Sequence, residues 1–176
     1  MRRLLSSRRV FEGRRVSVRL DEVEQPSGDR RVYEVVEHPG AVAIVALTAE
    51  GQILLVRQFR QPVGAELLEV PAGTIEPGEA PEACARRELV EEVGRAAARW
   101  ERVAAFYPSP GVLSEELHIF LARDLHAAFA PRDEEDLRLE IMPLEDAYER
   151  VAAGTIRDAK SIIGITMIRQ RLSSPA

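Results

Sequence analysis

The chain has 176 residues, a formal net charge of −5 and 45% hydrophobic residues, which is ordinary for one soluble globular domain. This negative charge does not favour binding to DNA or to an anionic membrane, so we expect neither a nucleic-acid nor a membrane partner. No apolar run approaches the roughly 20 residues needed to span a bilayer. The single cysteine, Cys84, excludes an internal disulfide and favours a reducing compartment, so we expect a cytoplasmic protein.

The N-terminal segment is rich in arginine, with four arginines among its first nine residues. We expect it to be a solvated, frayed terminus, with a transit peptide or a phosphate-binding arm as alternatives. Residues 15–25 and 31–37 flank the turn signal Pro26-Ser27-Gly28-Asp29 and predict an antiparallel hairpin. We expect residues 1–39 to form this N-terminal element and residues 40–176 to form the main domain.

The rest of the chain alternates predicted strands with predicted helices. Apolar patterns predict strands over residues 41–47, 53–59, 66–70, 102–107, 117–122 and 137–142. Residues 71–78 carry proline and glycine signals and are predicted to form a loop. Helical spacing predicts helices over residues 81–93, 144–153 and 159–172, with Gly94 and Gly154 as stop signals. This alternation predicts an α/β fold.

The helix predicted over residues 81–93 carries a crowded acidic face. Glu88, Glu91 and Glu92 lie three and four residues apart, so their carboxylates share one side, and Glu79 precedes the first turn. Such repulsion costs only about 0.2–0.5 kcal/mol per exposed pair, so a solvated acidic face is the simple alternative. However, the segment Pro71-Ala72-Gly73 can aim a backbone carbonyl at the same point. Carboxylates and a carbonyl form a hard-oxygen set that suits Mg²⁺, which commonly bridges substrate phosphates and supports phosphate chemistry.

The spacing of these residues resembles the signature of the Nudix hydrolases. That signature is G, five residues, E, seven residues, then R-E-U-x-E-E-x-G-U, where U is a bulky apolar residue. Here it reads Gly73, Glu79, Arg87-Glu88-Leu89, Glu91-Glu92 and Gly94, and only Arg95 departs from it. Seven identities at fixed spacing arise by chance at roughly one in 10⁸ positions. The resemblance implies a Nudix fold, in which a mixed β-sheet lies in an α/β/α sandwich after the N-terminal antiparallel hairpin.

The same resemblance implies roles for the residues of the signature. Glu88 and Glu92 become the main ligands of Mg²⁺ (or Mn²⁺), and the Ala72 carbonyl becomes a further ligand. Glu91 becomes another ligand or the water-activating base. Arg87 would orient the acids, although an ordinary surface cation is the alternative. Glu79 would either reach the metal through water or cap the loop.

Outside the signature, the chain resembles the ADP-ribose pyrophosphatase branch of the family. The matching stretches are residues 35–39, 56–60, 68–73 and 109–111. By this resemblance Arg60 contacts a phosphate or the ribose of the substrate, Glu115 approaches the metal or the terminal ribose side, and Pro110 sets the specificity. The acidic run at residues 133–136 would supply a catalytic glutamate, for which we choose Glu135 over Glu134. For the charged residues, simple surface or loop positions are the alternatives.

The resemblance implies a homodimer that hydrolyses ADP-ribose to AMP and ribose 5-phosphate with Mg²⁺. One alternative is hydrolysis of another nucleoside diphosphate sugar, such as GDP-mannose. Another is a Nudix module that senses ADP-ribose without cleaving it. The intact acidic helix argues against a sensor, because binding alone needs no hydroxide generator. We expect Cys84, His38 and His118 to be structural.

Overall fold

The computed structural model describes residues 1–130 and 137–173, which divide into two compact units. The smaller unit contains residues 1–40 and 106–116, and the larger unit contains the remaining described residues. The helices of the described chain are all too short or too polar to cross a lipid bilayer.

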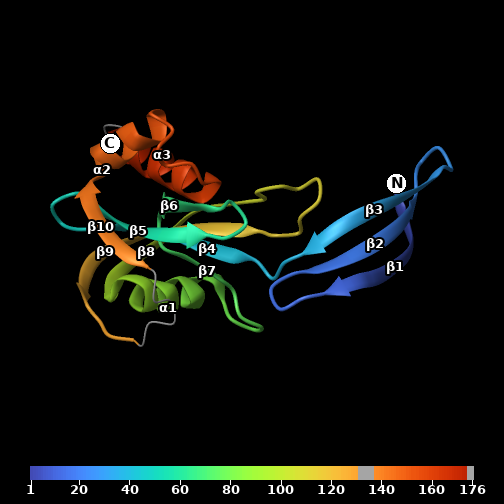
Figure 1. Ribbon diagram of the computed structural model, residues 1–176, viewed down its shortest axis with the longest axis horizontal. Helices are drawn as coiled ribbons and strands as arrows, with labels where there is room; N and C mark the ends of the chain where they lie inside the picture. Colours follow the sequence, from blue (N-terminus) through green and yellow to red (C-terminus); the bar gives the residue numbers. More distant parts are fainter. Residues whose placement is uncertain (131–136, 174–176) are drawn as a thin grey trace. The chain divides into compact units, whose positions relative to one another are not determined.

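The smaller unit is built on a three-stranded antiparallel sheet in the order β1-β2-β3 (Figure 1). Its strands are β1 (Arg3–Glu12), β2 (Ser17–Glu24) and β3 (Arg30–Glu37). The expectation of a frayed N-terminus is therefore wrong, and the predicted hairpin is two strands of a larger sheet. The N-terminal arginines are solvated, as expected, but they also pair across strands, since Arg3 lies 3.0 Å from Glu24 and Arg9 lies 2.9 Å from Glu37.

Residues 106–116 pack against the β3 edge of this sheet. Val36 donates its N–H to the Val112 carbonyl at 2.8 Å, and its own carbonyl accepts the Ser114 N–H at 3.0 Å. A parallel bridge joins Val36 to Leu113. The loop that carries Pro110 and Glu115 is therefore held by the N-terminal sheet of its own chain.

The larger unit contains a mixed sheet, as predicted, and this sheet has seven strands. Its central order is β10-β5-β4-β9-β8, with β6 paired to β5 and β7 paired to β4. The strands β4 and β9 run parallel, whereas β5, β6, β7 and β10 form antiparallel pairs. The bounds are β4 (Ala41–Leu47), β5 (Gln52–Arg60), β6 (Ala65–Glu69), β7 (Ala72–Thr74), β8 (Arg95–Phe106), β9 (Leu117–Ala127) and β10 (Arg138–Pro143).

Helices cover both faces of this sheet, which confirms the predicted sandwich (Figure 1). On one face, α1 (Pro81–Val93) buries Leu89 and Val93 in a cluster with Val42 and Ile44 of β4. On the other face lie α2 (Leu144–Ala152) and α3 (Ala159–Ser173). A Cβ atom on Gly164 of α3 would lie 3.0 Å from the Val45 side chain, so this glycine allows close packing.

The helix α1 has the bounds that the sequence predicts. It ends because Gly94 adopts φ +66°, a left-handed conformation that glycine takes without steric cost, and its N–H donates to the Val90 carbonyl at 3.0 Å. The segment after β6 differs from the prediction, since residues 72–74 form the short strand β7 rather than a loop. Three residues carry too little alternation to signal a strand, and β7 exists through its pairing with β4.

Candidate active site

Gly73 of β7 makes room for the carboxylate of Glu88. A Cβ atom at Gly73 would lie only 1.8 Å from Glu88 Oε1 and 2.5 Å from Glu88 Cγ, so any larger residue would displace that side chain. Glu88 is largely buried, with 13% of its side chain exposed. The first and last parts of the sequence signature are thus in direct contact.

Glu92 reaches the residue before Gly73. Its Oε2 accepts the Ala72 N–H at 3.0 Å. In an antiparallel ladder, the N–H and C=O of one residue point to the same side. The Ala72 carbonyl is therefore directed towards the side from which Glu92 approaches. Two carboxylates of α1 and one backbone carbonyl meet at the Ala72-Gly73 segment.

Arg87 links three glutamates of the signature. Its Nη1 donates to Glu88 Oε1 at 2.7 Å and to Glu91 Oε2 at 2.9 Å. Its Nε and Nη2 donate to the two oxygens of Glu79, each at 3.0 Å. Glu79 Oε2 also accepts the Glu76 N–H at 3.0 Å, so Glu79 closes the loop before α1. Arg87 therefore holds one carboxylate in the loop before α1 and two on the helix by hydrogen bonds.

The surroundings shift the pKa values of the acidic side chains in opposite directions. Hydrogen bonds from Arg87 lower the pKa of Glu79 to about 2, so Glu79 is anionic at neutral pH. Burial raises the pKa of Glu88, and the nearby Arg87 partly opposes this effect. Burial also raises the pKa of Cys84 to about 12, so this thiol stays protonated and is a core residue, as the sequence suggested.

The donor atoms around Ala72 are of the chemical type that binds a hard divalent cation. Within residues 1–130 and 137–173, no three His, Cys, Asp or Glu side chains are gathered closely enough to hold a metal ion. Arg87 lies between Glu88 and Glu91, and Glu92 is turned to the backbone. All of these donors are nevertheless oxygens of the kind that Mg²⁺ and Mn²⁺ prefer. Glu88, Glu92 and the Ala72 carbonyl are the groups that would hold such an ion, with Glu91 next to them on the helix.

The sequence of this chain matches the model of a known protein family. The NUDIX domain model matches residues 37–162, which is more than half of the chain. This chain is a member of the Nudix family. An ADP-ribose pyrophosphatase of Bacillus subtilis is 40% identical over 94% of this chain and 91% of its own length. An ADP-ribose pyrophosphatase of Mycobacterium tuberculosis is 36% identical over 93% of this chain and 81% of its own.

A solved structure of an ADP compounds hydrolase has the same fold as this Nudix protein. It superimposes with a TM-score of 0.86 at 27% identity and covers 97% of this chain and 94% of its own. The Nudix fold predicted from the sequence is therefore confirmed.

Arg60, which the sequence places at the substrate, lies at the end of β5. Its Nε and Nη2 donate to the two carboxylate oxygens of Glu69 at 3.0 and 2.7 Å. Its side chain keeps 32% exposure, whereas that of Glu69 has only 1%. No role for Glu69 was predicted, because a glutamate in a short strand carries no sign that it is buried beside an arginine.

Pro110 and Glu115 lie in the smaller unit of the Nudix chain, in the loop held by β3. Glu115 Oε1 lies 3.6 Å from Nδ1 of His38, which also accepts the Gly40 N–H at 3.1 Å. The Ser114 hydroxyl accepts the His38 N–H at 3.0 Å. His38 is therefore held in place on both sides, in agreement with the structural role expected for it.

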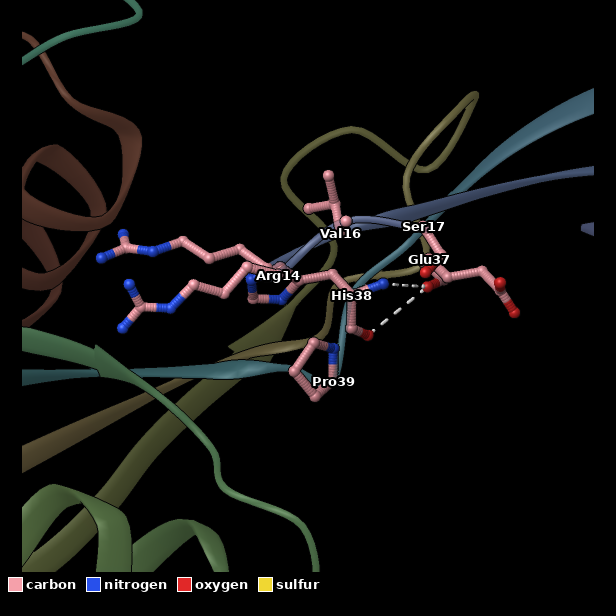
Figure 2. A pocket seen from close by; sticks show the side chains of 9 residues that line it. Arg14, Val16, Ser17, Glu37, His38 and Pro39 are labelled. Atoms are coloured by element: carbon pink, nitrogen blue, oxygen red, sulfur yellow. Dashed lines mark hydrogen bonds between the residues drawn. The ribbon is translucent and has the colours of Figure 1, made fainter. Parts of the chain in front are cut away.

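A cavity of about 420 Å³ opens beside His38. Figure 2 shows two hydrogen bonds between the His38 backbone and the Ser114 hydroxyl, which accepts the His38 N–H and donates to the His38 carbonyl; the side chain of Arg14 extends away from them. The cavity is lined by Gly13, Arg14, Arg15, Val16, Ser17, Glu37, His38, Pro39 and Ser114. None of the residues chosen from the sequence as substrate ligands lines it. Glu135, the candidate for a catalytic glutamate, lies outside the described residues.

Proposed function

We propose that this protein is a Mg²⁺-dependent pyrophosphohydrolase that cleaves ADP-ribose to AMP and ribose 5-phosphate. The observation that carries the proposal is the meeting of Glu88 and Glu92 with the Ala72-Gly73 segment. Two relatives that each match more than nine-tenths of this chain bear the name ADP-ribose pyrophosphatase, which supports the choice of substrate.

Each side chain near Ala72 has a distinct part in this proposal. A divalent cation held by Glu88, Glu92 and the Ala72 carbonyl would offset the charge on the diphosphate. Glu91, with 36% of its side chain exposed, is the glutamate we assign to accept a proton from water, and Glu135 is the alternative. Arg87 keeps Glu88 and Glu91 oriented through its Nη1 donors.

The remaining assignments concern the substrate. Arg60 is apt for the diphosphate because a planar guanidinium can donate two parallel hydrogen bonds to phosphate oxygens. We assign Glu115 to the terminal ribose side and Pro110 to specificity. We place the protein in the cytoplasm, where its free thiol would remain reduced.

A substrate panel tests the proposed reaction. Initial rates with Mg²⁺ should give a higher kcat/KM for ADP-ribose than for GDP-mannose, and chromatography should show AMP and ribose 5-phosphate in equal amounts. A higher kcat/KM for GDP-mannose would move the assignment to that nucleotide sugar. Tight binding of ADP-ribose without any product would instead support a sensor.

We also propose that the protein is a homodimer joined through the N-terminal sheet. Phe11 and Val36 both pair with Val18, so these three apolar side chains lie in one row on one face of the sheet. Val32 lies on the same face. Phe11 and Val32 are 55% and 63% exposed, and a second copy would remove this apolar area from water.

The dimer can be tested on the full-length chain by sedimentation. We expect Val32→Glu to yield monomers, because the new carboxylate would have to be buried against the partner directly beside Glu22, with which Val32 pairs. Arg31→Glu is the matched control, since the next residue along the strand points to the opposite face. A parent chain that sediments as a monomer, or a Val32→Glu variant that stays dimeric, would refute this interface.

A further inference from the structure

Glu69 is a buried carboxylate at the end of β6, three residues before Ala72. Its side chain is 1% exposed, and it is shared between two cations, Arg60 and Lys160. Arg60 binds it through both carboxylate oxygens, and Lys160 Nζ lies 2.5 Å from Oε2. A buried carboxylate is costly unless it is paired and hydrogen-bonded. The two cations keep Glu69 anionic, and its pKa is lowered despite the burial.

Lys160 is the only lysine in the chain, among 24 basic residues. Its side chain is 14% exposed, and Nζ also lies 2.9 Å from Asp158 Oδ2. An ammonium group is compact and has three donors, so it can join two carboxylates in a space where a planar guanidinium is harder to fit. The cluster Asp158, Lys160, Glu69 and Arg60 therefore alternates in sign and carries no net charge.

The same turn of α3 holds the backbone next to Glu69. Asp158 Oδ2 accepts the Ser161 N–H at 3.1 Å, and Ser161 Oγ accepts the Val70 N–H at 2.8 Å. Ser161 is fully buried. The start of α3 is thus fixed to the end of β6 by one backbone contact and one ionic contact.

We propose that Glu69 and Lys160 are positioning residues that hold the guanidinium of Arg60 in place for the phosphates of the substrate. Glu69 engages two adjacent N–H groups of Arg60, which fixes the plane of the guanidinium, while a third of the side chain remains exposed. Lys160 fixes the carboxylate of Glu69 against α3. This inference rests on the proposed function, in which Arg60 binds the diphosphate.

Positioning and a simple field effect have opposite signs at Glu69. Removing its negative charge makes the surroundings more positive, so a field effect alone would lower KM for an anionic substrate. Loss of the contact that fixes Arg60 would raise KM, because an unfixed guanidinium must be ordered when the substrate binds. A purely structural role would change the melting temperature and leave KM unaltered.

The test is a double-mutant cycle with Glu69→Gln and Arg60→Gln in the full-length enzyme, using ADP-ribose and Mg²⁺. We expect Glu69→Gln to raise KM by about 10-fold with kcat within about 3-fold of the parent. Arg60→Gln should raise KM by at least as much, and Glu69→Gln should add nothing to it. Glu66→Gln is the control, because Glu66 lies on the same strand with its side chain 47% exposed and pairs with Arg138 rather than with Arg60.

The outcomes separate the two proposals. If Arg60→Gln raises KM while Glu69→Gln leaves or lowers it, Glu69 does not position Arg60. If Arg60→Gln leaves KM unchanged, the phosphate contact of the proposed function is wrong, and the positioning role falls with it. If Glu69→Gln does not fold, Lys160→Met takes its place in the cycle. Its KM should rise several-fold in the parent and not in the Arg60→Gln background, and an equal rise in both would overturn the proposal.

Discussion

Replacing Glu88 or Glu92 with glutamine should lower kcat for ADP-ribose by about 100-fold or more, which corresponds to about 3 kcal/mol of barrier. Glutamine keeps the size of the side chain and one acceptor oxygen, so the hydrogen bonds from Arg87 and from the Ala72 N–H can persist. What is lost is the charge that binds a cation. We expect a similar loss for Glu91→Gln, because an amide cannot accept a proton from water.

Thermal unfolding distinguishes this result from damage to the fold. Each substitution relieves repulsion on a crowded acidic face, so unfolding free energies should stay within about 1 kcal/mol of the parent. Glu82→Gln is the matched control, since Glu82 lies on the same helix and pairs with Arg86 on the exposed surface. If Glu88→Gln, Glu91→Gln and Glu92→Gln all turn over ADP-ribose within a few-fold of the parent, the acidic face is a solvated surface without a catalytic role, and our mechanism is wrong.

Gly73→Ala should also lower kcat by about 100-fold, although it adds a single methyl group. The new Cβ atom would lie only 1.8 Å from Glu88 Oε1, which is far inside van der Waals contact. Glu88 must therefore turn away from β7. The backbone itself should accept alanine, because Gly73 has no positive φ angle. Where the backbone is compatible, replacing glycine with alanine commonly stabilises a protein by about 0.4–1 kcal/mol.

Gly51→Ala is the control with the opposite expectation. Gly51 lies in the turn between β4 and β5 with φ +77°, and nothing lies within 4 Å of the position of its Cβ. Alanine is strained there by roughly 1–2 kcal/mol, so the melting temperature should fall while kcat is unchanged. Measuring kcat and the melting temperature for both variants separates an effect on Glu88 from an effect on the fold. A fully active Gly73→Ala enzyme would show that the position of Glu88 does not matter for turnover.

The sequence predicted the helices and the central strands of the larger unit well because these elements carry strong local signals, whereas β8 begins at Arg95 rather than at residue 102. The helix α1 combines Pro81 at its start, apolar spacing and Gly94 at its end, and the structure has the same bounds. The continuous apolar strand β4 was equally clear. Local signals failed for β1, whose arginines suggested a frayed terminus but find carboxylates on β2 and β3. Such pairing depends on neighbouring strands, which a local pattern does not reveal.

The candidate site was predictable where spacing along one helix determines geometry. Glu88 and Glu92 are four residues apart, so their common side followed from the helix alone. The contact of Arg60 with Glu69 could not be predicted, because the two residues meet only when β5 and β6 pair. The contact of Lys160 with Glu69 could not be predicted either, because these two residues are 91 positions apart in the sequence. The rarity of lysine in this arginine-rich chain was the one available signal, and it gave no partner.

Turnover of ADP-ribose in Mg²⁺, then in excess EDTA, and again after Mg²⁺ is restored tests most directly whether a metal held at α1 drives hydrolysis. We expect formation of AMP to fall to the background rate in EDTA and to recover with Mg²⁺, because the acidic face cannot otherwise offset the charge of the diphosphate. The parent should recover fully, whereas Glu88→Gln should recover only to its own low rate. Unchanged formation of AMP in excess EDTA would contradict the metal assignment and the mechanism built on it.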